Sequence, residues 1–250
     1  MVRPSAFAAA ALLCALSFPA AAEPEIRIHG ATTVTYGLIE PNKEKIEKLA
    51  GVTLAVLPSS TSRGLADLAQ GKADIAMLAE PLDAIAARMN AKLPGSIDTD
   101  VLVGKHVGDA YVQFIVHPSN PLQRLSKEQL ASLFSGRTRN WSDLGGAKIP
   151  VLLVGEPTSS PHRMISEALA ISYDPELRAV QNTNQTAIVV MQAPGALSYI
   201  STAHDLPERR KLKVLESDLR LPLALYLVFR KDASIEVKKV VQAAAAVAGK

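Results

Sequence analysis

The sequence predicts an α/β protein of two lobes, each a mainly parallel sheet flanked by helices. Three observations support this fold class. Residues 25–78 alternate strand-like and helix-like segments separated by short loops, which is typical of a parallel sheet. A strongly apolar run over 110–116 suits a strand buried on both faces. Finally, 250 residues with 48% hydrophobic content can bury one large core or two smaller ones.

The first lobe is predicted from strands that alternate with helices. The strand segments are short and rich in apolar residues, and most end at a turn residue such as Gly30. They are 25–29, 52–57, 74–78 and 221–229. The helical segments are the stretch from Leu38 to Leu49, then 65–70 and 235–247. Pro41 is expected in the first turn of the first helix or as a break in it. The loop over 58–64 joins the second strand to its helix.

The second lobe is predicted to begin after a crossover near 101–107. Its strands are 110–116, 151–154 and 197–200, and its helices are 127–134, a helix from about His162, and 187–192. The helix over 127–134 has the clearest limits, because Ser126 and Gln129 have the spacing of a capping box and Gly136 suits a left-handed C′ position. Trp141, the only tryptophan, is expected to pack against this helix. The predicted lobes are 23–104 with 202–250, and 105–201.

The N-terminal segment has the features of an export signal. Arg3 supplies a positive charge, 6–18 is an apolar stretch too short to span a membrane, and small residues precede Glu23. We therefore expect a signal peptide over 1–22, cleaved near Ala22, and a periplasmic protein. A retained N-terminal anchor is the alternative.

Composition and motifs disfavour several other classes of protein. The single cysteine, Cys14, lies in the predicted signal after Leu13, where a lipoprotein would need a small residue, so the mature chain has no disulfide or thiol nucleophile. The 27 basic and 24 acidic residues are interspersed, which disfavours a nucleic-acid partner. The histidines lack metal-ligand spacing, and there is no nucleophile elbow or phosphate-cradling glycine loop. We expect no metal, no cofactor and no enzymatic activity.

Several short segments match a known family in the order in which that family has them. They are Gly30–Thr33, Asp74–Ala76 with Pro81–Leu82, the F-S-G-x-x-x-N-W run at 134–141, and Pro194–Ile200. Together they resemble the phosphate-binding-protein-like family, the periplasmic receptors of ABC phosphate importers. The resemblance implies a type II-like periplasmic binding protein fold whose lobes close around a small ligand. It also implies delivery to an inner-membrane ABC permease by a protein that acts as a monomer.

Three hydroxyl-rich loops are the candidate ligand sites. Such loops at the carboxyl ends of strands open helices whose N-termini favour anions, and hydroxyls can donate to an oxyanion. The resemblance assigns ligand contacts to Thr32, Thr61 and Ser160. The alternative for each loop is an ordinary N-cap, and for Arg63 and His162 an exposed position at a helix start. The candidate ligand-binding residues are Thr32, Thr33, Thr61, Ser62, Ser159 and Ser160, with Arg63 and His162 as further candidates.

The chain departs from the family pattern at the positions that specify phosphate. Where the family has an arginine, an aspartate and Gly-Thr, this chain has Glu156, Ala79 and Pro161–His162. A buried phosphate is held by a bidentate arginine, whereas Glu156 would repel a dianion by about 1 to 4 kcal/mol near 4 Å. We therefore keep two hypotheses. The default is a transport receptor for phosphate or another oxyanion, and the alternative is an accessory or sensory protein that lost tight phosphate binding.

Overall fold

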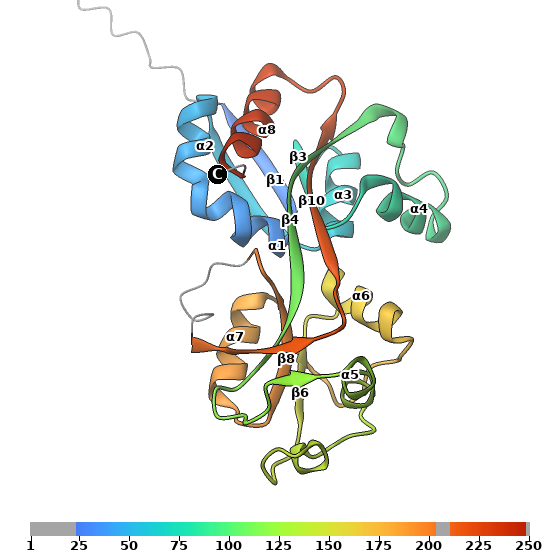
Figure 1. Cartoon of the computed structure of the whole chain (residues 1–250). Helices are drawn as coiled ribbons and strands as arrows, with labels where there is room; N and C mark the ends of the chain where they lie inside the picture. The colour runs from blue at the N-terminus through green and yellow to red at the C-terminus, as the bar shows by residue number, and fades with distance from the viewer. Residues whose placement is uncertain (1–23, 204–210, 249–250) are drawn as a thin grey trace, which may run out of the picture.

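The computed structural model describes residues 24–203 and 211–248. Within them the chain folds into two α/β lobes, which are the upper and lower halves of Figure 1. The predicted fold class is confirmed. The predicted signal peptide, its cleavage position and His204 lie outside the described residues.

Lobe I, the upper half, is built on parallel strands that each lead into a helix. Its parallel strands are β1 (Glu25–Ala31), β2 (Thr53–Ser59) and β3 (Ile75–Leu78), with β1 between the other two. Its helices are α1 (Thr32–Val34), α2 (Lys43–Ala50), α3 (Thr61–Ala69), α4 (Leu82–Lys92) and α8 (Ile235–Ala248). A π-helix over Thr35–Ile39 and a 3-10 helix over Glu40–Asn42 connect α1 to α2, and Pro41 lies in the 3-10 turn.

Lobe II, the lower half, repeats this arrangement with shorter strands. Its strands are β5 (Arg124–Leu125), β6 (Leu152–Gly155), β7 (Arg178–Ala179), β8 (Ala196–Ser201) and β9 (Lys213–Ser217). Among these, β6 is parallel to both β7 and β8. Its helices are α5 (Lys127–Phe134), α6 (Ser160–Leu169) and α7 (Thr183–Gln192). Short 3-10 turns at Thr99–Val101 and Trp141–Leu144 complete the helical elements of the described residues.

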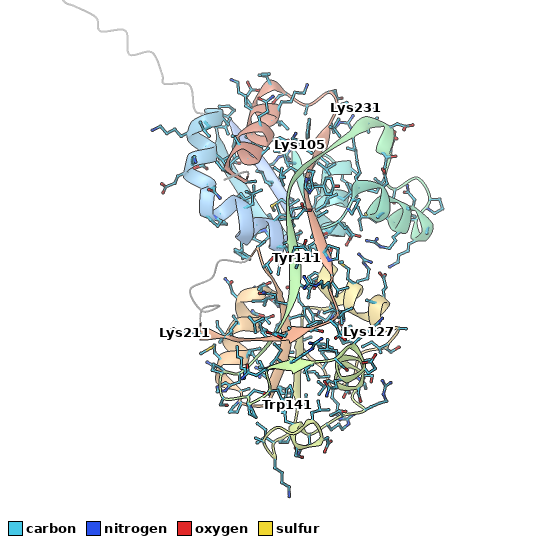
Figure 2. The ribbon with its side chains drawn as sticks, in the orientation of Figure 1. Lys105, Tyr111, Lys127, Trp141, Lys211 and Lys231 are labelled. Atoms are coloured by element: carbon cyan, nitrogen blue, oxygen red, sulfur yellow. The ribbon has the colours of Figure 1, made fainter. Side chains whose placement is uncertain are left out.

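Two long strands carry the chain between the lobes. β4 (Leu102–Val116) is antiparallel to β10 (Pro222–Arg230) over its first part and to β8 over Val112–Val116. The resulting sheet has the order β2-β1-β3-β10-β4-β8-β6-β7 and runs through both lobes. Figure 2 shows Tyr111 where β4 passes from one lobe to the other. The predicted strand over 110–116 is the second half of this continuous strand, and the expected crossover near 101–107 falls in its first half. The lobe boundaries at 104/105 and 201/202 stay a prediction, although β9, which pairs with the end of β4 and with β5, lies in lobe II beyond the second of them.

The helix α5 and Trp141 stabilise lobe II. Ser126 accepts a hydrogen bond from the Gln129 N–H at 3.2 Å, and the Gln129 side chain accepts one from the Ser126 N–H at 2.8 Å. This is the predicted capping box, and Gly136 has the expected left-handed conformation with a φ of 73°. Trp141 is fully buried in the same hydrophobic cluster as Leu130 and Phe134, and its indole N–H donates to the Gly195 carbonyl at 2.9 Å.

The helices around the cleft begin earlier than the sequence predicts. α1 starts at Thr32 rather than after a loop, α3 starts at Thr61 rather than at Leu65, and α6 starts at Ser160 rather than at His162. The helix α4 had no counterpart in the sequence-based assignment. The early starts place the predicted hydroxyl residues in the first helical turns, next to the strands that precede them.

A close approach of two backbones fixes the start of α3. A Cβ on Gly64 would lie 2.5 Å from the His29 carbonyl oxygen, so only glycine permits this packing of α3 against the end of β1. As a result, the first turn of α3 lies beside the first turn of α1. This brings two of the three predicted loops to one edge of the lobe I sheet.

Candidate functional site

A cavity of about 470 Å³ opens between the lobes. Figure 1 shows α4 of lobe I and α6 of lobe II on the same side of the molecule, and both helices line this cavity. The first turn of α3 and the loop over 157–159 complete its wall. Four predicted ligand-binding residues line it, which are Thr61, Ser62, Ser159 and Ser160.

The hydroxyls of Thr61 and Ser160 meet across the cleft. Their oxygens lie 3.0 Å apart, and both residues are buried. The Ala79 backbone N–H donates to the Thr61 hydroxyl at 3.2 Å. Each helix start is fixed by the residue before it, because Ser60 and Ser159 are side-chain N-caps of α3 and α6. The first helical residues of α3 and α6 therefore face one another from different lobes.

Glu80 is a buried carboxylate that joins both lobes through two arginines. It follows β3 and is 6% exposed. One carboxylate oxygen accepts from Arg88 of α4 at 2.6 Å and from Arg163 of α6 at 2.8 Å. The other accepts from the Ser160 hydroxyl at 3.3 Å. Arg163 also pairs with Glu167 of its own helix at 2.6 Å, so the two guanidiniums of this cluster are matched by two carboxylates.

A second buried carboxylate, Glu156, has a different environment. It lies with Thr32, Thr33 and Thr183 around a small cavity of about 10 Å³, and Ser159 lines both this cavity and the larger one. The Thr32 hydroxyl donates to Glu156 at 3.5 Å, the outer limit of a hydrogen bond. Burial raises the pKa of Glu156 from 4.5 to about 7, and the hydroxyls of Thr32 and Thr183 offset only part of this rise. Near neutral pH this carboxyl therefore titrates.

Two tyrosines hold His162 behind the cleft. Its Nδ1 atom lies 2.6 Å from the Tyr199 hydroxyl, and its ring stacks on Tyr173 with centroids 3.8 Å apart. Burial lowers the pKa of His162 from 6.5 to about 4, so the ring is neutral at mildly acid pH. The Tyr199 hydroxyl also accepts from the Glu156 backbone N–H at 3.1 Å. His162 therefore supports the loop before α6 through Tyr199.

The comparison with known families gives a single answer. Residues 18–248 match the PBP superfamily domain. This chain belongs to the PBP superfamily. The match covers both lobes and extends across the described residues, in agreement with the two-lobed fold.

Two curated relatives of this chain are named phosphate-binding proteins. The chain is 22% identical over 185 residues to the phosphate-binding protein PstS of Bacillus subtilis, covering 73% of this chain and 59% of that protein. It is 30% identical over 121 residues to phosphate-binding protein PstS 2 of Streptococcus agalactiae, covering 48% of this chain and 37% of that protein. The chain thus spans less than two thirds of the length of these relatives.

Solved structures share the fold at low sequence identity. A putative phosphate ABC transporter substrate-binding protein with bound phosphate from Clostridium perfringens has a TM-score of 0.74 at 16% identity, covering 88% of this chain and 92% of that one. An ABC-type phosphate transport receptor from Vibrio cholerae has a TM-score of 0.62 at 18% identity, covering 88% and 93%. A variant of the OxyR2 regulatory domain from Vibrio vulnificus has a TM-score of 0.58 at 16% identity, covering 94% and 99%. These matches establish the fold of this superfamily member.

The predicted contact residues divide into three groups by their positions. Thr61, Ser62, Ser159 and Ser160 line the large cavity, and Thr32 and Thr33 line the small one beside it. His162 lies behind the cleft wall. Arg63 is directed elsewhere, because its guanidinium pairs with Asp67 four residues along α3 at 3.0 Å and its side chain is 65% exposed. Their roles as ligand contacts stay predictions.

The sequence-based reasoning missed Arg88, Lys92 and Tyr199. Arg88 and Lys92 lie on α4, a helix that was not predicted, although Asp83 in its first turn and Lys92 in its last are favourable helix-end charges. The role of Tyr199 depends on β8 lying beside β6, which no local pattern reveals. Glu80 was noted only as a neighbour of Ala79.

The described residues were also compared with the requirements of a metal site and of a membrane-spanning helix. No group of three or more His, Cys, Asp or Glu side chains within 24–203 and 211–248 is arranged to hold a metal ion. In the same ranges, every helix is too short or too polar to cross a bilayer.

Proposed function

We propose that this chain is a periplasmic solute-binding protein that closes its lobes around a small oxyanion and delivers it to an inner-membrane ABC importer. Phosphate is the default ligand, and the protein acts as a monomer without catalytic activity. Export by a signal peptide cleaved near Ala22 is part of this proposal. The names of the curated superfamily relatives support the choice of phosphate.

The observation that carries the proposal is the meeting of Thr61 and Ser160. These two residues are the first of α3 and α6, helices of more than eight residues that come from different lobes. The N-terminus of each helix is the positive end of its dipole. A small rotation of the lobes would let both hydroxyls donate to an anion between them rather than to each other. Arg88 and Arg163 lie at the same place, where both pair with Glu80 and Arg163 also pairs with Glu167. The ligand contacts are then Thr61 and Ser160, with Thr32, Thr33, Ser62 and Ser159 in the adjoining wall.

Three observations favour the alternative, an accessory or sensory protein of the same fold. Glu80 already accepts hydrogen bonds from Arg88, Arg163 and Ser160, which are donors that an oxyanion would use. Pro161 also removes one backbone donor from the start of α6. The likeness to an OxyR2 regulatory domain means that this fold also occurs in regulatory domains.

Thermal unfolding of residues 23–250 with and without millimolar phosphate, at fixed ionic strength and pH 6.5, separates the two functions. A ligand present at a hundred times its dissociation constant stabilises by about 2.7 kcal/mol, which raises the midpoint by roughly 5 to 11 °C for a protein of this size. Sulfate and chloride at matched ionic strength serve as controls.

A rise with phosphate that is lost in Thr61→Ala supports the transport receptor. If phosphate does not raise the unfolding midpoint, the protein does not bind phosphate tightly. A rise with sulfate alone would replace phosphate by another oxyanion, and no rise with any of these anions would favour the accessory or sensory function.

A further inference from the structure

The cleft cavity is larger than a single oxyanion needs. Its volume is about 470 Å³, whereas a water molecule takes about 30 Å³ of liquid and orthophosphate is only a phosphorus atom with its four oxygens. Cavities that bind organic ligands measure about 300 to 1,000 Å³. The cavity therefore has room for a ligand that carries an organic part beside its anionic group.

The cavity follows one face of α4. Ile85, Arg88, Met89 and Lys92 line it at spacings of three, four and seven residues, which places them along a single helical stripe. From Ile85 to Lys92 the helix rises about 10 Å. Arg88 and Ser160 both contact Glu80, so the hydroxyl pair lies near the middle of this stripe. Lys92 follows Arg88 by four residues, one helical turn farther along the same face.

The charges of the cavity wall leave a cation for a second anionic group. Arg88, Lys92 and Arg163 line the cavity with one carboxylate, Glu80, and Arg163 also pairs with Glu167 outside the cavity wall. Both guanidiniums are bound to Glu80, whereas the Lys92 ammonium makes no hydrogen bond or ion pair with any residue in the described ranges. Between Arg88 and Lys92, Met89 offers an apolar and adaptable surface.

We propose that the ligand is an organic phosphate with a second anionic group, rather than orthophosphate alone. This inference rests on the proposed function and specifies the ligand of the same cleft. The phosphate lies between Thr61 and Ser160, the carbon skeleton lies against Met89, and the second anionic group pairs with Lys92. Orthophosphate occupies the first of these positions only.

Calorimetric titration of residues 23–250 with three probes at fixed pH and ionic strength tests this placement. The probes are orthophosphate, glycerol 3-phosphate, which adds the carbon skeleton, and 3-phosphoglycerate, which adds a carboxylate. The variant is Lys92→Gln. The matched control is Lys48→Gln, because Lys48 is also an exposed lysine in the last turn of a lobe I helix, but on α2 and away from the cavity.

We expect 3-phosphoglycerate to bind roughly tenfold tighter than orthophosphate, because its carbons bury apolar surface and its carboxylate pairs with Lys92. Lys92→Gln should weaken 3-phosphoglycerate about two- to fivefold, as for an exposed ion pair, and leave the other two probes unchanged. Lys48→Gln should change none of them.

Two results overturn the inference and are distinct from each other. If orthophosphate binds as tightly as both organic probes, or if Lys92→Gln has no larger effect on 3-phosphoglycerate than Lys48→Gln, the inference fails and the proposed oxyanion receptor stands. If none of the three probes binds, both the inference and the proposed phosphate receptor fail.

Discussion

Glu80 and Glu156 are equally buried carboxylates of one cleft, and the protein treats them in opposite ways. Each is 6% exposed. Glu80 is held by two guanidiniums and a serine hydroxyl, so its charge is compensated within the described structure. Glu156 has hydroxyl partners but no cationic partner among the residues that the structure describes, and burial raises its pKa to about 7.

This difference shows two ways in which the protein accommodates a buried acidic residue. A buried charge is tolerated when it is paired, and otherwise the group shifts its pKa and becomes neutral. Glu80 uses the first solution and links the lobes. Glu156 uses the second, so below pH 7 its repulsion of an anion falls away. If the cleft binds an anion as proposed, Glu156 at the position of the family's arginine should weaken that binding most at alkaline pH.

The largest expected effect comes from removing both cations from Glu80. In the double variant Arg88→Met with Arg163→Met, the carboxylate keeps only the Ser160 hydroxyl among its described partners. We expect the free energy of unfolding to fall by about 3 to 5 kcal/mol, as for a buried ion pair broken on one side. Denaturant unfolding at pH 7.5 measures it. Adding Glu80→Gln should recover most of the loss.

A matched arginine controls for the loss of charge. Arg230→Met removes a surface arginine that pairs with the exposed Asp232, and its free energy of unfolding should be close to that of the native protein. If the double variant unfolds like this control, Glu80 does not depend on its cations and the contrast with Glu156 fails.

A smaller effect should follow the titration of Glu156. Its folded-state pKa of about 7 is above the ordinary 4.5, so the folded protein holds a proton that the unfolded chain releases between these pH values. Stability from this group is therefore present at low pH and is lost as the pH rises through about 7. We therefore compare the free energy of unfolding of Glu156→Gln with that of the native protein. This difference should be roughly 2 to 3 kcal/mol more favourable to the variant at pH 8 than at pH 5.

Unfolding curves at the two pH values measure this difference. Glu44→Gln changes an exposed residue on α2. Its free energy of unfolding should differ from that of the native protein by the same small amount at both pH values. Parallel behaviour of Glu156→Gln and Glu44→Gln would mean that Glu156 is ionised normally in the folded state.

The accuracy of the sequence-based predictions differs between α5 and the cleft for a physical reason. The limits of α5 depend on Ser126, Gln129 and Gly136, which act within a few residues of one another, so the sequence predicts them closely. The starts of α3 and α6 lie in runs of hydroxyl residues, where every Ser or Thr is an acceptable N-cap. The sequence therefore identifies the loops, but not which hydroxyl caps the helix and which enters the cleft.

The charge pairs of the site lie beyond what local patterns can predict. Glu80 and Arg163 are 83 residues apart in sequence, and Thr61 and Ser160 are 99 apart. Such contacts depend on how the two lobes are placed, which follows from the path of β4 and β10 rather than from any segment near the site. The family resemblance predicted the two lobes and the hydroxyl residues expected to contact the ligand. At the position where the family has an arginine, however, this chain has Glu156.

The most direct test of the central claim is a calorimetric titration of phosphate into residues 23–250 at pH 6.5, where most Glu156 side chains are neutral. We predict one saturable site per chain, with an affinity about tenfold weaker in Ser160→Ala because one of the two facing hydroxyls is lost. Ser166→Ala, on the same helix but outside the cavity wall, should bind as the native protein does. No saturable binding, or equal weakening by both substitutions, would contradict an anion site between the starts of α3 and α6.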